Sequence, residues 1–475
     1  MFRKEHPVLP LRVLSLARGI AFLGAAALAF SCASDPTDSG QAGGGSGGGA
    51  GAAGAGGTGA AGSGGSSGSA GSAGSSGTCN GSDHSLSSGA GQLFGSHTFQ
   101  YPGDVARPSG GPSALDSATA SFYDAWKASY LKTDSCGTYV ASSGGTGAQD
   151  SLTISEAHGF GMVITALMEG HDSDAHSTFD NLFTFFSQHQ SASGPGLMTW
   201  AITPQCGPDP GGNDSATDGD IDIAFSLLLA DKQWGSSGSI NYFAEAEKVM
   251  CAIESREINP TTGLTLLGDW ATPDDTDRFG TRPSDFMTDH FHAFTAATGY
   301  GGWSRTIDAM YSVISTMQSS FSPSTGLIPD FVVNTDTSPV PASANYLETQ
   351  NDGAYAYNSC RVPWRIGTDY LTTGDARAKA AVQKINGWIK SASGGQADSI
   401  ASIYKLDGTA VHADWSGDPA FVAPFGVAAM VSGDQSWLDD IWTTLAAGQV
   451  AGDNYYGDTI QVLCMIAMSG NWWAP

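Results

Sequence analysis

Basic residues are scarce in this chain. Lys and Arg together number 20 among 475 residues, against 46 Asp and Glu, so the formal net charge at pH 7 is −26. Nucleic acids and anionic membrane surfaces are bound mainly through Lys and Arg. The charge balance therefore argues against both as partners and leaves neutral or cationic polymers.

Metal-binding patterns are also missing. The seven cysteines form no CxxC or Cys/His zinc motif, and there is no His-Glu-x-x-His. His290 and His292 lie two residues apart, and such positions on a helix face different ways, so the two cannot chelate one ion together. The Gly-rich stretch near the N-terminus precedes no strand–helix unit that could cradle a phosphate. We therefore expect no metal and no cofactor.

The chain lacks an apolar run long enough for a retained membrane span. The best candidate, residues 19–30, is short, follows several basic residues and ends at Ser31-Cys32. These features are typical of a secretion signal, which we place at residues 1–32. Cys32 is a candidate for lipid attachment, although Ala29 stands where such sites usually have Leu, and the sequence leaves lipidation open.

Residues 33–78 consist largely of Gly, Ala and Ser without periodicity. Such a segment cannot bury enough surface to offset its ordering entropy, so we predict a flexible linker. Residues 79–475 then form the globular domain. Because an exported chain permits disulfides, we expect pairing among Cys79, Cys136, Cys206 and Cys251. Cys360 and Cys464 lie in apolar segments and are predicted to be packed thiols.

Two kinds of predicted helix alternate along the globular part. Apolar runs begin near Ser155, Asp218, Asp285, Tyr357, Phe421 and Gly457. Between them lie amphipathic candidates at 118–131, 177–188, 242–255, 301–318, 377–391 and 435–447. Helices that are apolar all round are buried, and those with one apolar stripe lie outside. The alternation favours an all-α inner ring wrapped by an outer ring, with an irregular helical bundle as the alternative.

Acidic residues interrupt the starts of the apolar runs. Asp218, Asp220 and Asp222 enter one run, and Glu156 enters another. Burying a carboxylate costs several kcal/mol unless it is paired, so a chain that does so usually has chemistry there. In a helical barrel the inner helices begin at one end, where their loops converge. We expect one cleft to collect Glu156, Asp218, Asp285, Tyr357, Asn358 and Tyr456.

These motifs resemble the family-eight glycoside hydrolases. The resemblance rests on Ala-Thr-Asp-Gly-Asp at 216–220 with its continuation to Trp234, Ser-Glu-Ala-His-Gly-Phe-Gly-Met at 155–162, Arg-Val-Pro-Trp-Arg-Ile at 361–366 and Ser-Gly-Asn-Trp-Trp at 469–473. The likeness runs in order from about residue 101 to the end. It implies an (α/α)6 barrel and inverting hydrolysis of a β-1,4-linked polysaccharide.

One position departs from the usual pattern of that family. Asn358 stands where many members carry an Asp base, and an amide cannot accept a proton from water. An Asn-bearing subgroup, which includes lichenases, cellulases and chitosanases, takes its base from an upstream Glu, and Glu348 matches that residue. The segment 282–287 (Arg-Pro-Ser-Asp-Phe-Met) also resembles this subgroup. Asp352 and Asp285 remain alternative bases.

The resemblance implies a role for each candidate. Glu156 would be the acid, although at a helix start the dipole lowers its pKa, so burial and a nearby Asp218 would have to raise it. Asp218 would bind and distort the sugar; the alternative for both residues is a helix cap. The aromatic residues expected to stack on sugar faces are Trp200, Tyr357, Tyr455, Tyr456 and Trp270. Arg361 would orient Asn358 or Glu348, and Arg361, Asn358 and Asp285 are also expected to contact the substrate. Arg365, Asp220 and Asp222 are expected to make structural contacts.

The sequence thus predicts a secreted or cell-surface endo-acting glycoside hydrolase that cleaves β-1,4 linkages. Mixed-linkage β-glucan and cellulose are the preferred substrates, and chitosan is next. A polysaccharide lyase and a non-catalytic carbohydrate-binding protein are the rival functions. The first would favour a basic cleft, and the second could lose the acids that this chain retains. We expect a monomer whose partner is the polysaccharide.

Overall fold

The computed structural model describes residue 79 and residues 89–142, 151–272, 275–450 and 452–475. The predicted signal (1–32), the linker (33–78) and the candidate lipid site Cys32 lie outside the described residues. These boundaries stay predictions. Within the described ranges, no helix combines the length and apolar character needed to cross a bilayer.

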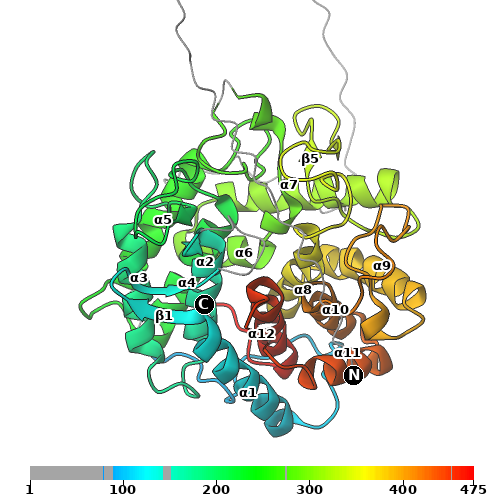
Figure 1. Ribbon diagram of the computed structural model, residues 1–475, viewed down its shortest axis with the longest axis horizontal. Coiled ribbons are helices and arrows are strands. Elements are labelled where there is room, and N and C mark those ends of the chain that lie inside the picture. Colours follow the sequence, from blue (N-terminus) through cyan, green and yellow to red (C-terminus); the bar gives the residue numbers. More distant parts are fainter. Residues whose placement is uncertain (1–78, 80–88, 143–150, 273–274, 451) are drawn as a thin grey trace, which may run out of the picture. The chain divides into compact units, whose positions relative to one another are not determined.

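Twelve α-helices alternate between two rings in the described part of the chain (Figure 1). The inner helices are α2 (Ser155–Leu167), α4 (Thr217–Trp234), α6 (Thr288–Thr298), α8 (Val362–Thr373), α10 (Pro419–Ser432) and α12 (Tyr455–Ser469). The outer helices are α1 (Pro112–Tyr130), α3 (Ala175–Gln188), α5 (Tyr242–Arg256), α7 (Gly302–Thr316), α9 (Ala376–Ala392) and α11 (Gln435–Ala446).

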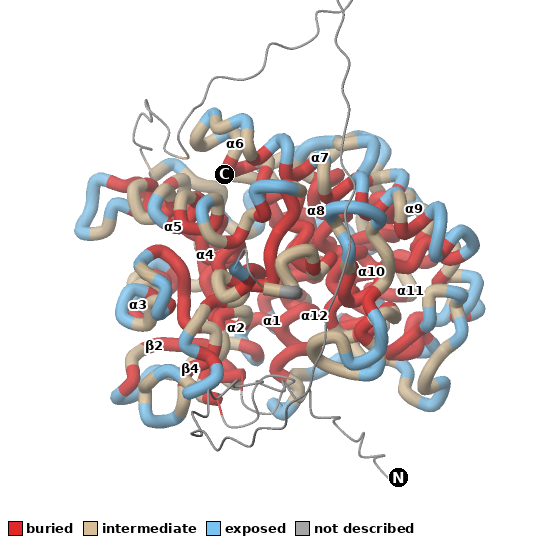
Figure 2. Tube along the Cα trace, turned by 90° about the horizontal axis from the view of Figure 1, so that it is seen from above, coloured by how far each residue is buried: buried red, intermediate tan, exposed pale blue. Residues whose placement is uncertain are grey.

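The inner helices form a closed ring. Each packs against the next in the order α2, α4, α6, α8, α10, α12, and α12 packs against α2. Each of the outer helices α3, α5, α7, α9 and α11 packs on the inner helix that precedes it, and α1 packs on α12. The buried residues follow the inner ring, and the exposed ones lie on loops and outer helices (Figure 2). The predicted (α/α)6 barrel is confirmed.

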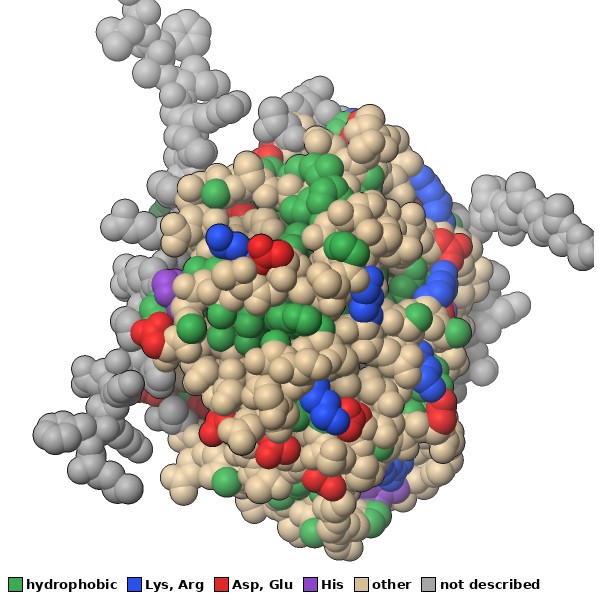
Figure 3. Space-filling model, turned by 90° about the vertical axis from the view of Figure 1, so that its right-hand side faces the viewer, with side chains coloured by type: hydrophobic (Ala, Val, Ile, Leu, Met, Phe, Trp, Pro, Cys, Tyr) green, Lys and Arg blue, Asp and Glu red, His purple; other side chains and the backbone are tan. Residues whose placement is uncertain are grey.

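Sequence composition explains which helix lies inside. In α10 every residue from Ala420 to Val431 is buried, and Phe421 and Phe425 are fully enclosed. Burying one such side chain stabilises the fold by about 1.5–3 kcal/mol. Outer helix α9 buries a stripe that includes Val382, Ile385 and Ile389. Its charged residues pair outside that stripe, Arg377 with Asp375 and Lys390 with Asp434. Figure 3 views this side of the molecule, on which acidic and basic side chains intermingle.

Two inner helices begin later than predicted. α6 was expected near Asp285 but begins at Thr288, because Phe286 and Met287 have ψ angles of 65° and 67°, outside the helical range. α8 was expected near Tyr357 but follows a 3-10 turn, η4 (Ser359–Arg361). In both cases a 3-10 turn at the mouth of the barrel replaces the first helical turn. This turn is η2 (Pro283–Asp285) before α6 and η4 before α8.

Three short two-stranded antiparallel sheets were not predicted, since strands of two to four residues leave little periodicity to read. They pair β1 (Leu131–Asp134) with β2 (Gly137–Val140), β3 (Thr153–Ile154) with β4 (Ala201–Ile202), and β5 (Val332–Val333) with β6 (Val340–Pro341). Leu131, predicted as the end of a helix, therefore belongs to β1. The β3–β4 pair bears on the site, because it joins the start of α2 to the segment that carries Trp200.

The cysteine predictions are confirmed. Cys79 pairs with Cys251, and Cys136 pairs with Cys206. Cys360 and Cys464 are buried thiols. The first disulfide fixes residue 79 to outer helix α5, and each bridge is expected to stabilise the fold by about 2–4 kcal/mol.

Candidate active site

Glu156 and Asp218 lie in the first turns of neighbouring inner helices, α2 and α4. Glycines allow these turns to touch. A Cβ atom on Gly159 would lie 2.8 Å from the Gly219 carbonyl oxygen, and one on Gly219 would lie 2.6 Å from Ser155 Oγ. The backbone contact therefore brings the two carboxyl groups to the same place.

Arg361 joins these carboxyl groups. Its Nη1 donates to Glu156 Oε2 at 2.5 Å and to Asp218 Oδ2 at 2.9 Å. Its Nη2 donates to Ser284 Oγ at 2.9 Å and to Asn358 Oδ1 at 3.1 Å. The guanidinium is 1% exposed, so it forms the floor of the site. The prediction that Arg361 orients Asn358 agrees with this geometry.

Asn358 carries the chain of contacts on to Glu348. Its Nδ2 donates to Glu348 Oε2 at 2.8 Å, while its Oδ1 accepts from Arg361. Because the guanidinium can only donate, the amide must point its oxygen at Arg361 and its nitrogen at Glu348. Glu348 keeps 13% of its side chain exposed, as does Glu156. Both carboxyl groups therefore retain a face toward solvent.

Arg282 belongs to the site, although no role for it was predicted from the sequence. Its guanidinium lies 3.3 Å from Asp218 Oδ1, 3.1 Å from Asp285 Oδ1 and 3.8 Å from Glu348 Oε1. Its position three residues before Asp285, in an otherwise buried motif, was the available signal. Arg282 supplies the second positive charge among the acids.

The charges of the site are set by burial and by these two arginines. Burial raises the pKa of Glu156 to about 7; Arg361 opposes the rise and Asp218 adds to it. A proton donor at position 156 requires a pKa raised in this direction. Burial also raises the pKa of Glu348 to about 7, although Arg282 and the hydrogen bond from the Asn358 amide act to lower it. For Asp218 burial acts upward, but Arg282 and Arg361 outweigh it and lower the pKa to about 2.

The two alternative bases are engaged with protein groups. The Asp352 carboxylate accepts from the backbone N–H groups of Leu347, Glu348 and Thr349 at 2.7–3.0 Å. Asp285 is fully buried and accepts from Arg282 and from the Ser284 hydroxyl. Neither carboxylate is left facing solvent, so Asp285 also offers little surface for the substrate contact predicted for it.

The predicted aromatic residues divide into half-buried and buried ones. Trp200 and Trp270 are half-buried, and the Trp200 carbonyl accepts from Ser155 N beside the acid at 2.9 Å. Trp270 packs on the same small apolar cluster as Leu347, the residue before Glu348. The three remaining rings, all tyrosines, make hydrogen bonds to protein groups.

Tyrosines enclose the acid side of the site. Tyr455 is fully buried and its hydroxyl donates to Glu156 Oε1 at 3.2 Å. Tyr456 is 4% exposed, lies against the Arg361 guanidinium and donates to the Tyr357 carbonyl. Tyr357 is half-buried and its hydroxyl donates to Asp418 Oδ2 at 3.2 Å. Of these rings, only Tyr357 keeps appreciable surface for a sugar.

Below the site, acidic residues make the structural contacts expected of them. The Asp222 carboxylate accepts hydrogen bonds from both Nη atoms of Arg365, at 2.9 and 2.5 Å, and contacts His290 Nε2 at 2.9 Å. Asp220 accepts from Met198 N at 2.7 Å and shares a hydrogen bond with buried Glu257. This second pair lies beside the segment that leads to Trp200.

A metal-ligand arrangement occurs away from these acids. Among the described residues, His292, Asp369 and Asp375 could offer ligand atoms within 4.8 Å of one another. Asp375 is already paired with Arg377 at 2.6 Å, and Asp369 accepts from the Tyr311 hydroxyl. We assign these groups to ion pairing between α6, α8 and α9.

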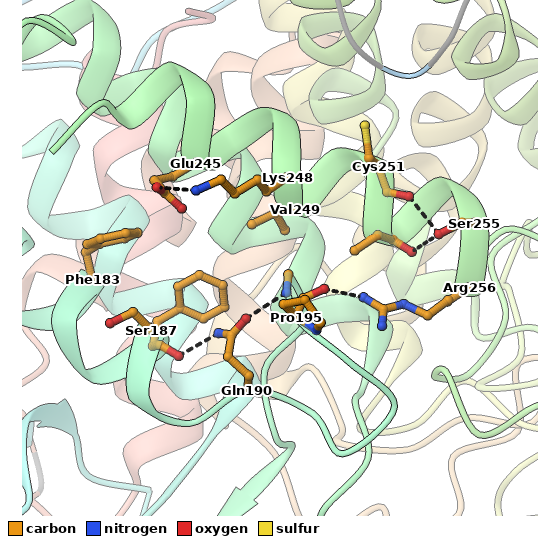
Figure 4. A pocket seen from close by; sticks show the side chains of 13 residues that line it. Phe183, Ser187, Gln190, Pro195, Glu245, Lys248, Val249, Cys251, Ser255 and Arg256 are labelled. Carbon is orange, nitrogen blue, oxygen red and sulfur yellow. Dashed lines mark hydrogen bonds and ion pairs between the residues drawn. The ribbon is translucent and has the colours of Figure 1, made fainter.

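A groove of about 610 Å³ lies between outer helices α3 and α5 (Figure 4). Lys248 and Glu245 pair across its upper edge at 2.7 Å, and Arg256 donates to the Pro195 carbonyl at 2.6 Å. None of the acids at the mouth of the barrel lines it. The groove is therefore separate from the candidate active site.

Comparisons with known proteins agree with this geometry. A family model described as "Glycosyl hydrolases family 8" matches residues 112–470. A beta-glucanase of Niallia circulans is 46% identical over 381 residues, which are 80% of this chain and 91% of that protein. An endoglucanase of Bacillus sp. (strain KSM-330) is 40% identical over 374 residues, 76% of this chain and 78% of that one.

Solved structures show the same architecture. An apo beta-1,3-1,4-glucanase from Paenibacillus sp. X4 superposes with a TM-score of 0.76 at 44% identity, covering 81% of this chain and all of that one (100%). Rex8A from Paenibacillus barcinonensis superposes at 0.61 with 17% identity over 75% of this chain and 93% of that one, which bears on the fold alone. The chain is a glycoside hydrolase and belongs to glycosyl hydrolases family 8.

Proposed function

We propose that this enzyme is an endo-acting β-glucanase that cleaves β-1,4 linkages with inversion, with mixed-linkage β-glucan or cellulose as substrate. The observation that carries the proposal is the line of contacts from Glu156 through Arg361 and Asn358 to Glu348. It holds two partly exposed carboxyl groups at one mouth, each with a pKa raised to about 7. Inverting hydrolysis needs such a pair, one protonated and one ionised.

Glu156 is the proposed acid. Its raised pKa keeps a fraction of the carboxyl protonated near neutral pH, which a proton donor to the leaving oxygen requires. Asp218 stays ionised because Arg282 and Arg361 face it. Its proposed role is to bind the sugar at the cleavage point and to keep Glu156 protonated through its negative charge.

Glu348 is the proposed base, in keeping with the Asn-bearing subgroup of the family. An amide at 358 cannot take a proton from water, and Glu348 is the carboxylate that Asn358 contacts. The alternatives are less suited, since Asp352 accepts hydrogen bonds from its own loop and Asp285 is enclosed. Trp200, Trp270 and Tyr357 are the proposed sugar-stacking rings.

The substrate assignment is supported by the relatives, which are named a beta-glucanase, an endoglucanase and a beta-1,3-1,4-glucanase. The test is reducing-sugar release from mixed-linkage β-glucan, carboxymethyl-cellulose, chitosan and xylan, assayed in parallel. We expect the first two to be cleaved fastest. A preference for chitosan would move the enzyme to the chitosanases, and no release from any of the polymers would contradict the proposal.

Glu156→Gln tests the acid. The amide keeps the volume and removes the proton, so hydrolysis should fall by a factor of about 10³ or more while polymer binding persists. Proton NMR of the first product formed by the unmodified enzyme checks inversion. Residual turnover within about tenfold of the parent enzyme would rule out Glu156 as the acid. A product of retained configuration would rule out the inverting scheme and return Asp218 to consideration as a nucleophile.

Export is part of the proposal. The apolar segment 19–30 and the Gly-rich linker support a secreted or surface-tethered enzyme. Expression in a bacterial host, followed by mass analysis of the mature N-terminus, tests it. Cleavage before Cys32 with an added acyl mass indicates a lipid anchor, and an intact residue 1 on cytoplasmic protein would contradict export.

A further inference from the structure

Two buried carboxylates near Glu348 have no part in the mechanism described above. Asp352 and Asp330 are 1% and 3% exposed. Neither pairs with an arginine or lysine in the described structure; each accepts hydrogen bonds from backbone and hydroxyl donors instead. Burying a carboxyl group without a cationic partner is costly, so these two residues are candidates for a function.

Asp352 holds the loop that bears Glu348. Its Oδ2 accepts from Leu347 N at 2.7 Å and from Glu348 N at 3.0 Å, and its Oδ1 accepts from Thr349 N at 2.7 Å. The Thr349 hydroxyl adds a fourth contact at 3.3 Å. The donors come from the base residue and both of its neighbours. The backbone of Glu348 is thereby fixed by a single side chain.

Asp330 does the same for Asn358. Its Oδ1 accepts from Ala356 N at 3.0 Å, Ser359 N at 2.7 Å and Ser359 Oγ at 2.7 Å. These donors flank Asn358 on both sides and shape the turn that replaces the first turn of α8. The amide that orients Glu348 is thus itself held by a buried acid.

The segments of Asp352 and Asp330 are joined by backbone hydrogen bonds. Asp330 N donates to the Ala354 carbonyl at 2.8 Å, and Phe331 N donates to the Asp352 carbonyl at 2.9 Å. The loop of Glu348 and the turn of Asn358 therefore form one unit with a carboxylate at each end. Movement of Asp352 or of Asp330 would therefore disturb the Glu348–Asn358 hydrogen bond.

We propose that Asp352 and Asp330 are paired positioning residues that fix the general base Glu348 by holding the backbone of its loop and of the Asn358 turn. The inference rests on the proposed role of Glu348. The charged groups that act on Glu348 are Arg282, Asp330 and Asp352, besides the neutral Asn358 amide. Arg282 favours the ionised base, and the two aspartates disfavour it, so the aspartates keep it able to take a proton near neutral pH.

The test compares Asp352→Asn and Asp330→Asn with a control, Asp172→Asn. Asp172 also accepts from a backbone N–H, a lysine and a tyrosine, but it lies beyond the opposite end of α2. The readout is the pH profile of kcat/KM on mixed-linkage β-glucan, with folding checked by circular dichroism. Removing either negative charge stabilises ionised Glu348. The acid limb of the profile should therefore move to lower pH by about half a unit or more.

Rates provide the second readout. Misplacing the base should lower kcat by about tenfold to a hundredfold in Asp352→Asn. In the Glu348→Ala background rescued by azide, the same substitution should cost no more than about threefold, because the group it positions is gone. Ser359→Ala removes a hydroxyl donor to Asp330 and keeps every charge. It should lower kcat without moving the acid limb, and it serves where an Asp variant does not fold.

The possible results separate the two hypotheses. If Glu348→Ala alone keeps near-normal turnover, the proposed base is wrong, whatever the aspartate variants do. If Glu348→Ala is inactive but the acid limb stays in place in both aspartate variants, as in Asp172→Asn, the positioning proposal is overturned. An undiminished penalty of Asp352→Asn in the azide-rescued background would also overturn it.

Discussion

Asn358 Nδ2 lies 2.8 Å from Glu348 Oε2, and this bond places an amide beside the carboxylate that we propose as the base. The same amide receives Arg361 on its oxygen side, so its orientation is determined. An aspartate here would bring a second carboxyl group against Glu348. Position 358 therefore distinguishes two arrangements of the proposed base: an amide beside Glu348, or an aspartate that could itself accept the proton. Substitution at this position tests the difference.

Glu348→Ala should lose nearly all turnover and recover part of it in azide. Removal of the side chain opens space on the face from which the water attacks, where a small anion can enter. The product should be a glycosyl azide of inverted configuration, identified by mass spectrometry and NMR. Chloride at the same ionic strength is the control. If Asp352→Ala or Asp285→Ala were inactive while Glu348→Ala worked normally, the base would be that other residue.

Asn358→Asp should raise the pKa of Glu348 further, since two neighbouring carboxylates resist joint ionisation. The acid limb of kcat/KM should move to higher pH, and activity at pH 6 should fall by about tenfold. The double variant Asn358→Asp/Glu348→Ala should be more active than Glu348→Ala without azide, because a carboxylate is again available to the water. Equal activity of the two would show that the water cannot reach position 358.

Glu257→Gln tests the buried Asp220–Glu257 pair. Burial raises the pKa of Glu257 to about 8, from a usual value of 4.5. The folded protein thus keeps a proton that the unfolded chain has lost, so stability falls as pH rises from about 4.5 to about 8. Glutamine can still form a hydrogen bond with Asp220 and cannot ionise.

The variant should therefore gain stability relative to the parent as pH rises from 5 to 9, by on the order of 2–4 kcal/mol. Thermal melts across this range provide the measurement. Glu245→Gln, at a surface ion pair, serves as the control and should follow the parent profile. A constant difference between parent and Glu257→Gln at every pH would contradict the shared proton.

Truncations at the N-terminus separate the linker from the disulfide. Deleting residues 1–78 should leave stability and activity unchanged, since Cys79 can still pair with Cys251. Deleting residues 1–79 should lower the free energy of unfolding by about 2–4 kcal/mol and keep kcat. Denaturant melts and the glucan assay check both. Loss of soluble, active protein in the shorter deletion would show that the domain begins earlier.

The helical architecture could be predicted because buried and exposed helices differ in composition along their whole length. The runs that contain Met162–Leu167 and Phe421–Val431 are apolar all round, and these segments are the buried parts of α2 and α10. Acidic residues at the starts of such runs likewise marked Glu156 and Asp218. These signals are local in the sequence, so a single chain is enough to find them.

The contacts among site residues could not be predicted in the same way. Arg282 contacts Asp285 within its own turn, but it also reaches Asp218 and Glu348 from two distant segments, and nothing near Arg282 in the sequence specifies those two contacts. The holders Asp330 and Asp352 act through backbone donors, which carry no residue-type signal. The sequence leaves Asp352 open as an alternative base, because spacing alone does not show which of its lone pairs are already occupied by hydrogen bonds.

The close approach of α2 and α4 at Gly159 and Gly219 limits how this enzyme can be redesigned. Any larger residue at either position would meet backbone or Cβ atoms within 2.8 Å and push the helices apart. The packing of the α2 and α4 helix starts therefore tolerates no larger side chain at these two positions. Changes in polymer preference must come from the surrounding loops, such as 197–212, 268–272 and 342–347. Libraries aimed at new substrates should randomise these loops and keep Arg282, Glu348, Asp352 and the helix starts unchanged.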